Sequence, residues 1–472
     1  MKHNYSICLA FVIIFLLTSC KPEVQKNDSI EGNWQSIGYG RILQIDSISY
    51  SQFDITKISC LPTKEGSSSD FNGVISLRND TLSIRRGLST YNYVRIKNLP
   101  DLCNKNTQVN NDPIYNFEVF ASTFKKHYAY FELNKINWNN LYAAYRSKIT
   151  EETSEVELYL IMEDMLAELH DNHGSIKPTD DVHEAAENLS ISDDTDSNLK
   201  WYGDFTIANL VAEHFLDEDL TKDSWLVHWG KMKGNIGYIQ IKAMMLFGEL
   251  GLSEELVEEN GFVQTYFDAF DSLSGKDQIE MEVNGIRKIM NNVMSDLKDT
   301  KHIILDVRFN GGGNDEVSLE ILRHFNPTKK LVAYKKGKLG NEFTKTIPIY
   351  IEPSSKPYIK PVYVLSSQQS ASASDMLLLS SIELHHLIRI GSHSQGAISD
   401  ALQKELPNGW HFSLSNEIYS DVKGNVYENI GIPVDYELNY PDDRQIFFRS
   451  VADNLEGDKE LILQAIAEIN KD

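Results

Sequence analysis

A serine-rich stretch between an expected strand and an expected helix is the first candidate for covalent chemistry. Ser370, Ser372 and Ser374 alternate with alanine just before Asp375, and the apolar run 362–365 precedes them. A hydroxyl here lies at the carboxyl end of a buried strand, where open α/β sheets bind ligands. It also lies at the start of a helix, whose free N–H groups favour developing negative charge. The stretch can therefore present a nucleophile, although a small-residue turn with a helix cap explains the same residues.

A run of three glycines is the second candidate. Gly311, Gly312 and Gly313 follow the apolar run 303–309, so they lie at the same kind of sheet edge. Glycine lets backbone N–H groups approach a ligand closely. The run lacks the Lys-Ser/Thr pair of a phosphate-binding loop, which disfavours a nucleotide site.

The elements that must position these residues form the last 240 or so residues. Apolar strands alternate with helices there, which is typical of an α/β domain with a mostly parallel sheet. We expect strands at 236–241, 303–309, 362–365 and 387–390, and helices at 286–297 and 372–382.

Two further folding units precede this domain. Short apolar runs at 42–45 and 81–84, separated by turn-forming residues, indicate a small β-rich domain. Apolar residues at helical spacing, at 117–128 and 158–169, then indicate a helical subdomain, with Gly174 as the terminator of its second helix. The expected division is a signal peptide at 1–20, a tether at 21–30, the β-rich domain at 31–108, the helical subdomain with a connector at 109–224, and the α/β core at 225–472.

Three segments together resemble the tail-specific or C-terminal processing protease family, which includes the tricorn core protease. They are 305–314 (LDVRFNGGGN), 370–375 (SASASD) and 431–435 (GIPVD), and the resemblance runs from about Pro113 to the end. It implies a serine endopeptidase with Ser372 as nucleophile. It also implies an oxyanion hole made by the N–H groups of Ala373 and a loop glycine, Gly312 or alternatively Gly311.

The general base is expected to be His173. One branch of the family uses a lysine after the strand that follows the nucleophile's helix, but the segment 391–399 contains none. The tricorn-like branch uses a histidine in a motif that resembles Leu169 to Gly174, and the near-neutral pKa of histidine suits proton transfer. His170 is the alternative base. The two histidines lack a compelling third ligand, so we predict no metal and no cofactor.

A carboxylate is expected to orient the base. The resemblance favours Glu428, which precedes the Gly431-Ile432-Pro433 turn, with Asp375 and Asp171 as competitors. These residues would form a Ser-His-Glu triad that hydrolyses a protein or peptide substrate through an acyl-enzyme.

The N-terminus predicts export and a lipid anchor. Lys2 precedes an apolar stretch that ends in Leu17-Thr18-Ser19-Cys20, which resembles the lipobox of bacterial lipoproteins, with Cys20 as the lipidated residue. We therefore expect a cell-envelope protein attached to a bacterial membrane through Cys20. Cys60 and Cys103 can form a disulfide under such oxidising conditions. The oligomeric state is not defined by the sequence.

The charge of the chain disfavours one class of partner, and the length of one segment disfavours one kind of domain. The formal net charge of -23 and the lack of a basic cluster disfavour nucleic acid. About sixty residues separate His173 from Ile236, which is too few for the PDZ domain of many tail-specific relatives. Two rival functions stay open: a catalytically silent ligand- or peptide-binding protein on the same fold, and an envelope esterase or amidase.

Overall fold

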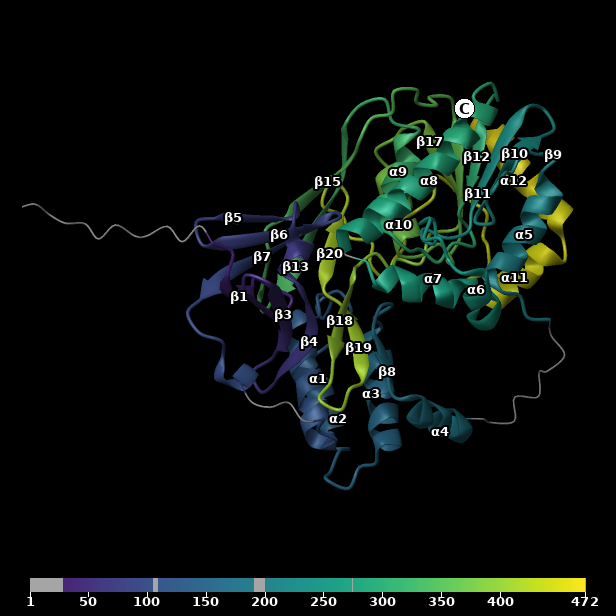
Figure 1. The fold of residues 1–472 in the computed structure, drawn as a ribbon. Coiled ribbons are helices and arrows are strands. Elements are labelled where there is room, and N and C mark those ends of the chain that lie inside the picture. Colours follow the sequence, from purple (N-terminus) through teal and green to yellow (C-terminus); the bar gives the residue numbers. More distant parts are fainter. Residues whose placement is uncertain (1–28, 105–108, 191–199, 274, 472) are drawn as a thin grey trace, which may run out of the picture.

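The N-terminal domain is one antiparallel sheet of seven strands. The computed structural model describes residues 29–104, 109–190, 200–273 and 275–471. The strands are β1 (Gly32–Ser36), β2 (Arg41–Ile45), β3 (Ser49–Ile55), β4 (Cys60–Ser67), β5 (Ile75–Arg78), β6 (Thr81–Arg86) and β7 (Ser89–Ile96). Their order in the sheet is β4-β3-β2-β1-β7-β6-β5 (Figure 1). Trp34, Leu43, Leu82 and Tyr93 form the centre of its core.

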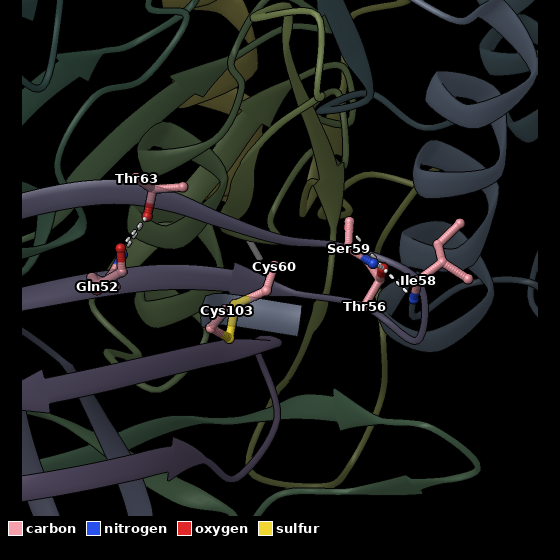
Figure 2. The surroundings of a disulfide bond; sticks show 7 residues. All are labelled: Gln52, Thr56, Ile58, Ser59, Cys60, Thr63 and Cys103. Atoms are coloured by element: carbon pink, nitrogen blue, oxygen red, sulfur yellow. Dashed lines mark hydrogen bonds between the residues drawn. A yellow bond between two sulfur atoms is a disulfide. The ribbon is translucent and has the colours of Figure 1, made fainter. Parts of the chain in front are cut away.

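A disulfide between Cys60 and Cys103 closes this domain, as Figure 2 shows. It joins the first residue of β4 to the short helix η2 (Asp101–Asn104), with the two Cα atoms 4.9 Å apart. A second short helix, η1 (Ser68–Phe71), follows β4. The bond links the end of the domain back to its sheet, so the pairing that the sequence allowed is present in the structure.

The helical subdomain follows. Its elements are α1 (Pro113–His127), α2 (Trp138–Arg146), α3 (Glu155–Leu169), β8 (Ser175–Lys177) and α4 (Asp180–Ser190). Asp112 caps α1 and Ser154 forms a capping box with Glu157 at α3, so the free N–H groups of both helix starts are bonded. The two periodic segments are therefore helices, and α2 lies between them.

Strands from much later in the chain complete this subdomain. β18 (Ala401–Glu405) and β19 (His411–Ser415) form a hairpin, and β19 pairs antiparallel with β8. Trp410 and Phe412 are buried in the aromatic core of α1 and α3, and the rings of Phe120 and Phe412 lie 5.3 Å apart. The hairpin thus joins the helical subdomain to the α/β core.

The core is built on a second seven-stranded sheet, of order β21-β17-β16-β12-β11-β10-β9. Its strands are β9 (Glu218–Asp219), β10 (Val227–Met232), β11 (Ile236–Ile241), β12 (Ile303–Asp306), β16 (Val362–Ser366), β17 (Leu387–Gly391) and β21 (Tyr436–Glu437). The five strands from β11 to β21 run parallel, whereas β9 and β10 pair antiparallel.

Helices cover both faces of this sheet (Figure 1). One face carries α8 (Gly275–Leu297), α9 (Asp315–Arg323) and α10 (Ala373–Ser381), and the other carries α5 (Asp204–Phe215), α11 (Arg444–Ala452) and α12 (Leu455–Ile469). The remaining helices are α6 (Glu254–Asn260) and α7 (Phe262–Asp271). Both faces of the central strands are therefore buried, which explains why those strands are apolar runs.

The core as a whole is a mixed α/β structure, so the prediction of a mostly parallel sheet is not confirmed for it. A further antiparallel sheet contains β13 (Lys330–Leu339), β14 (Glu342–Phe343), β15 (Ile347–Ile351) and β20 (Glu417–Ser420). This sheet was not predicted from the sequence, because four lysines interrupt the apolar pattern of β13. Across the four described ranges we find no helix with the length and apolar character that a bilayer crossing requires.

Candidate active site

Ser372 occupies a strained turn between β16 and α10. Its backbone angles are φ 54° and ψ −117°, and α10 begins at the next residue, Ala373. A residue with a side chain adopts such a conformation at a cost of about 1–3 kcal/mol, so the surrounding structure must hold it there. The hydroxyl makes no capping hydrogen bond to α10. The helix-cap explanation of this serine therefore fails, and the hydroxyl stays available for chemistry.

Asp375 holds this turn in place. Its buried carboxylate accepts hydrogen bonds from the N–H groups of Gly396 at 3.0 Å and Ala397 at 2.9 Å, and also from the N–H of Ser372 and the hydroxyl of Ser394. Burial raises the pKa of Asp375 to about 6, although these hydrogen bonds lower it. Asp375 joins the nucleophile turn to the segment after β17, and this structural task occupies both of its oxygens.

The glycine loop packs directly against Ser372. Gly312 has φ +105°, and a Cβ atom there would lie 2.6 Å from the Cβ of Ser372 and 3.0 Å from the N of Ala373. The loop is fixed on its other side by Met244, whose N–H donates to the Gly312 carbonyl at 2.8 Å and whose carbonyl accepts from Asn314 at 2.7 Å. Only glycine fits at position 312, because any side chain would displace Ser372.

Two backbone N–H groups beside Ser372 are free in the part of the chain that the structure describes. They belong to Ala373 and Gly311, neither of which donates a hydrogen bond there. The N–H of Gly312 instead donates to the Asn310 side-chain oxygen at 2.9 Å. The expected oxyanion donors thus lie together at the nucleophile, but Gly312 is already engaged.

The histidine loop follows α3. The helix ends at Leu169, and His170, with φ 50° and an exposed ring, takes the left-handed C-cap position that was expected further along at Gly174. Side chains stabilise this end: Tyr128 and Asn134 donate to the Leu169 carbonyl at 3.0 and 2.9 Å. The terminal carbonyls are therefore bonded without a glycine motif.

His173 is held by its backbone. Its N–H donates to Asp171 at 3.0 Å, and its carbonyl accepts from the Ser413 hydroxyl on β19 at 2.6 Å. The ring nitrogen Nδ1 is buried and bonds to nothing in the described residues. Burial lowers the pKa of His173 below its usual value, while Asp171 and Asp400 oppose this shift. The ring is therefore neutral at neutral pH, which is the state that a general base requires.

Glu428 lies in the loop after β20. Its Oε2 accepts from the N–H groups of Ile398 and Ser399, both at 3.0 Å, and its Oε1 is buried with no partner among the residues described. Burial raises the pKa of Glu428 to about 8, and the neighbouring Asp375 and Asp171 raise it further. At neutral pH this carboxyl therefore holds a proton in the structure as it stands.

Asn429 ties the Glu428 loop to the histidine loop. Its Nδ2 donates to the His170 carbonyl and to the Asn134 side chain, both at 2.9 Å, and its Oδ1 accepts from Asn172 at 3.0 Å. Asn429 itself has φ 57°, a conformation that asparagine tolerates better than most residues. The sequence did not single out its role, because its side-chain partners lie between 257 and 295 residues away along the chain.

The three predicted triad residues are not joined by hydrogen bonds. Throughout the described ranges, none connects the Ser372 hydroxyl, the His173 ring and the Glu428 carboxyl. Ser372 and Ala373 lie in contact with Gly312. Separately, hydrogen bonds of Asn429 join the histidine loop to the loop that carries Glu428. Among the described residues, no cluster of three or more histidine, cysteine, aspartate or glutamate side chains could hold a metal ion.

A buried charge cluster lies beside these loops and was not predicted. The Lys335 amine is 2.7 Å from Glu417 and 2.9 Å from Asp400, and the Tyr419 hydroxyl donates to Asp400 and Asp315 at 3.0 and 3.1 Å. Burial raises the pKa of Glu417 to about 7, although Lys335 lowers it. Asp315 follows the glycine loop, so this cluster connects β13 with the loop that carries the oxyanion donors.

Two family models indicate the class of this protein. The family model of peptidase family S41 matches residues 235–438, and that of the tricorn protease C1 domain matches residues 110–167. Among curated proteins no match was found. These matches identify the chain as a serine-type peptidase whose core is similar to peptidase family S41.

Solved structures show the same fold at low sequence identity. A putative peptidase from Parabacteroides merdae ATCC 43184 is similar with a TM-score of 0.51 and 21% identity, covering 74% of this chain and 98% of that one. Mature CPAF is similar with a TM-score of 0.52 and 12% identity, covering 76% of this chain and 98% of that one. These likenesses extend the shared fold over about three quarters of the chain.

Proposed function

We propose that this peptidase is an endopeptidase of the bacterial cell envelope that uses Ser372 as its nucleophile. The observation that carries the proposal is the strained turn at Ser372, where the hydroxyl is free of capping contacts and the Cβ atom lies against the glycine loop. Strain of this kind persists where the surrounding structure enforces it, and Asp375 supplies that enforcement. A neighbouring serine, Ser370, is a poorer nucleophile because its buried hydroxyl donates to the Val307 carbonyl.

His173 is the general base in this proposal and Glu428 orients it. Two facts support the pair: His173 Nδ1 and Glu428 Oε1 are both buried without partners, and one is a potential donor whereas the other is an acceptor. Their loops are already linked through Asn429. In the proposed active arrangement these loops close so that Nδ1 donates to Oε1 and Nε2 faces Ser372. The carboxyl would then lose its proton, because a nearby imidazolium lowers its pKa.

The oxyanion is stabilised by backbone N–H groups. The first donor is Ala373, whose N–H is free and starts α10, where the helix dipole adds favourable charge. The second comes from the glycine loop. Gly311 is free to donate, whereas Gly312 acts only after its hydrogen bond to Asn310 breaks.

The chemistry follows from these positions. His173 accepts the Ser372 proton as the oxygen attacks the peptide carbonyl, and it then gives that proton to the leaving amine as the C–N bond breaks. The same ring then deprotonates a water molecule, which attacks the acyl carbon. The bond from that carbon to the Ser372 oxygen breaks, the ring returns the proton to this oxygen, and the acid is released.

Lipid attachment places this reaction at a membrane. We propose that Cys20 carries the lipid and that the chain faces the bacterial envelope, a proposal that rests on the lipobox-like sequence alone. The signal segment and Cys20 lie outside the described residues. The Cys60–Cys103 disulfide supports export, because such bonds persist in oxidising compartments.

Turnover of casein and of a panel of simple esters tests the proposal. We expect peptide bonds to be cleaved, and Ser372→Ala to reduce turnover by a factor on the order of a million, as loss of a nucleophile does elsewhere. Ser374→Ala is the matched control, because that buried hydroxyl has no partner in the described structure. Ester cleavage without casein cleavage would identify an esterase, and no turnover of either substrate would favour a binding protein.

A further inference from the structure

A cavity of about 400 Å³ lies far from the catalytic residues in sequence, on the N-terminal domain. It is enclosed by strands β2, β3, β4, β6 and β7 and by the turn that joins α7 to α8. None of the residues that we assign to catalysis lines it. Its size is that of a small-molecule site.

The inner wall of this cavity carries a cation that lacks a counter-ion. Arg41 is half-buried on β2, with its guanidinium 5.7 Å from the centre of the Tyr91 ring and beside the Tyr93 hydroxyl. Its Nε is buried and finds no hydrogen-bond partner in the described ranges, and the guanidinium joins no ion pair there. The guanidinium does hydrogen-bond to Tyr93, and Asp54 attracts it from beyond ion-pair distance. A largely buried cation with no direct counter-ion is costly, which points to an anion that completes the site.

The neighbouring carboxylate attracts Arg41 but forms its direct ion pair with another cation. Asp54 is paired with Arg41 across β2 and β3, but its carboxylate lies 2.7 Å from the Lys404 amine. Two cations, Arg41 and Lys404, thus share one carboxylate. The pKa of Lys404 is lowered to about 8, mainly by burial. The positive charge of Arg41 contributes to this lowering, in agreement with an excess of positive charge.

The rim of the cavity is balanced in charge. Three exposed cations and three exposed carboxylates line it: Lys64, Arg85, Arg86, Glu65, Asp70 and Asp271. The net positive charge therefore comes from Arg41. Apolar surface completes the wall, where the tilted rings of Tyr50 and Phe71 contact each other with centres 4.7 Å apart and Leu43 is buried.

We propose that this cavity binds a small organic carboxylate. The carboxylate accepts hydrogen bonds from the Arg41 guanidinium and the Tyr93 hydroxyl, and the apolar body packs on Tyr50 and Phe71. A planar guanidinium matches a carboxylate in geometry, and one such cation balances one negative charge. A phosphate dianion would leave a negative charge uncompensated beside the rim carboxylates.

Binding of matched acids and amides tests this site. Benzoate, phenylacetate and N-acetylphenylalanine are titrated into the purified protein at concentrations up to the millimolar range, each beside its uncharged amide and with phenyl phosphate as a further probe. We expect at least one acid to bind about tenfold or more tightly than its amide, because hydrogen bonds to a charged partner discriminate by that much. Ser372→Ala should bind the same acid unchanged, which separates this site from the proposed catalytic one.

Two variants locate the binding. Arg41→Gln should bring the affinity for the acid down to that for the amide, whereas Arg78→Gln, an exposed cation of β5 outside the cavity, should leave it unchanged. If Arg41→Gln does not fold, Tyr93→Phe should still weaken binding of the acid and leave binding of the amide unchanged. The proposal is overturned if no acid binds, if acid and amide bind equally, if phenyl phosphate binds best, or if folded Arg41→Gln keeps the parent affinity.

Discussion

At the scale of single residues, the site combines a strained serine with two buried groups that lack partners. Ser372 is held by Asp375, whereas His173 Nδ1 and Glu428 Oε1 are each without a hydrogen bond in the described structure. Neutral forms of His173 and Glu428 tolerate this burial, because burial penalises their charged forms. In the proposed mechanism this is a resting arrangement, in which His173 is neutral and able to accept a proton.

Glu428→Gln should stabilise the protein at alkaline pH while it reduces activity. The carboxyl has a pKa of about 8 in the fold against about 4.5 when exposed, so the unfolded state loses its proton first and stability falls as pH rises between these values. A neutral amide removes that penalty, which amounts to several kcal/mol by order of magnitude. Urea unfolding at pH 5 and pH 8 measures the change, and we expect the stability gain at pH 8 only.

Peptide turnover by the same variant tests the orienting role. An amide cannot stabilise the imidazolium, so we expect kcat to fall by a factor of about a thousand or more. Unchanged kcat would exclude Glu428 as the orienting group and would leave Asp171 as the nearest alternative to His173.

At the scale of elements, strand ends and their loops could be predicted from sequence, whereas the contacts between loops could not. β11, β12, β16 and β17 follow the apolar runs closely, because buried parallel strands need continuous apolar residues. β12 ends at Asp306 rather than Phe309, since Asp306 and Arg308 form a buried ion pair there. The left-handed position at His170, the clamp at Asn429 and the Arg41 cavity depend on residues that are distant in sequence.

Gly312→Ala should disrupt the glycine loop. Its φ of +105° is unfavourable for alanine, and the added Cβ would lie 2.6 Å from the Cβ of Ser372. We expect a loss of stability of about 2–4 kcal/mol by thermal or urea unfolding, together with loss of peptide turnover. Gly311→Ala is the control for stability, because no atom lies within 4 Å of a Cβ at that position. Equal stability of the two variants would show that the glycine loop does not pack tightly against the turn at Ser372.

At the scale of the whole molecule, buried polar contacts join the N-terminal domain to the rest. Tyr39, next to β2, donates its hydroxyl to Glu417 at 2.5 Å, and Lys404 on β18 pairs with Asp54 on β3. Glu417 also contacts Lys335, which reaches Asp400 at the start of β18. The N-terminal domain is thus in contact with the same cluster that borders the glycine loop.

Lys335→Met should destabilise the whole chain. The amine is almost fully buried between Glu417 and Asp400, and its removal leaves these carboxylates and the nearby Asp315 without a cation. We expect a loss of about 3–5 kcal/mol at neutral pH. The loss should shrink at acidic pH, because protonation of the carboxylates removes their charge. Lys336→Met, the next residue on β13, is the matched control in the same urea titrations.

The most direct test of the central claim is the position of a covalent fluorophosphonate adduct, mapped by mass spectrometry of proteolytic peptides. The account predicts one adduct on Ser372, its absence in Ser372→Ala, its retention in Ser374→Ala and strongly slowed labelling in His173→Ala. An adduct on another serine, or labelling of Ser372 at an unchanged rate without the His173 ring, would contradict it.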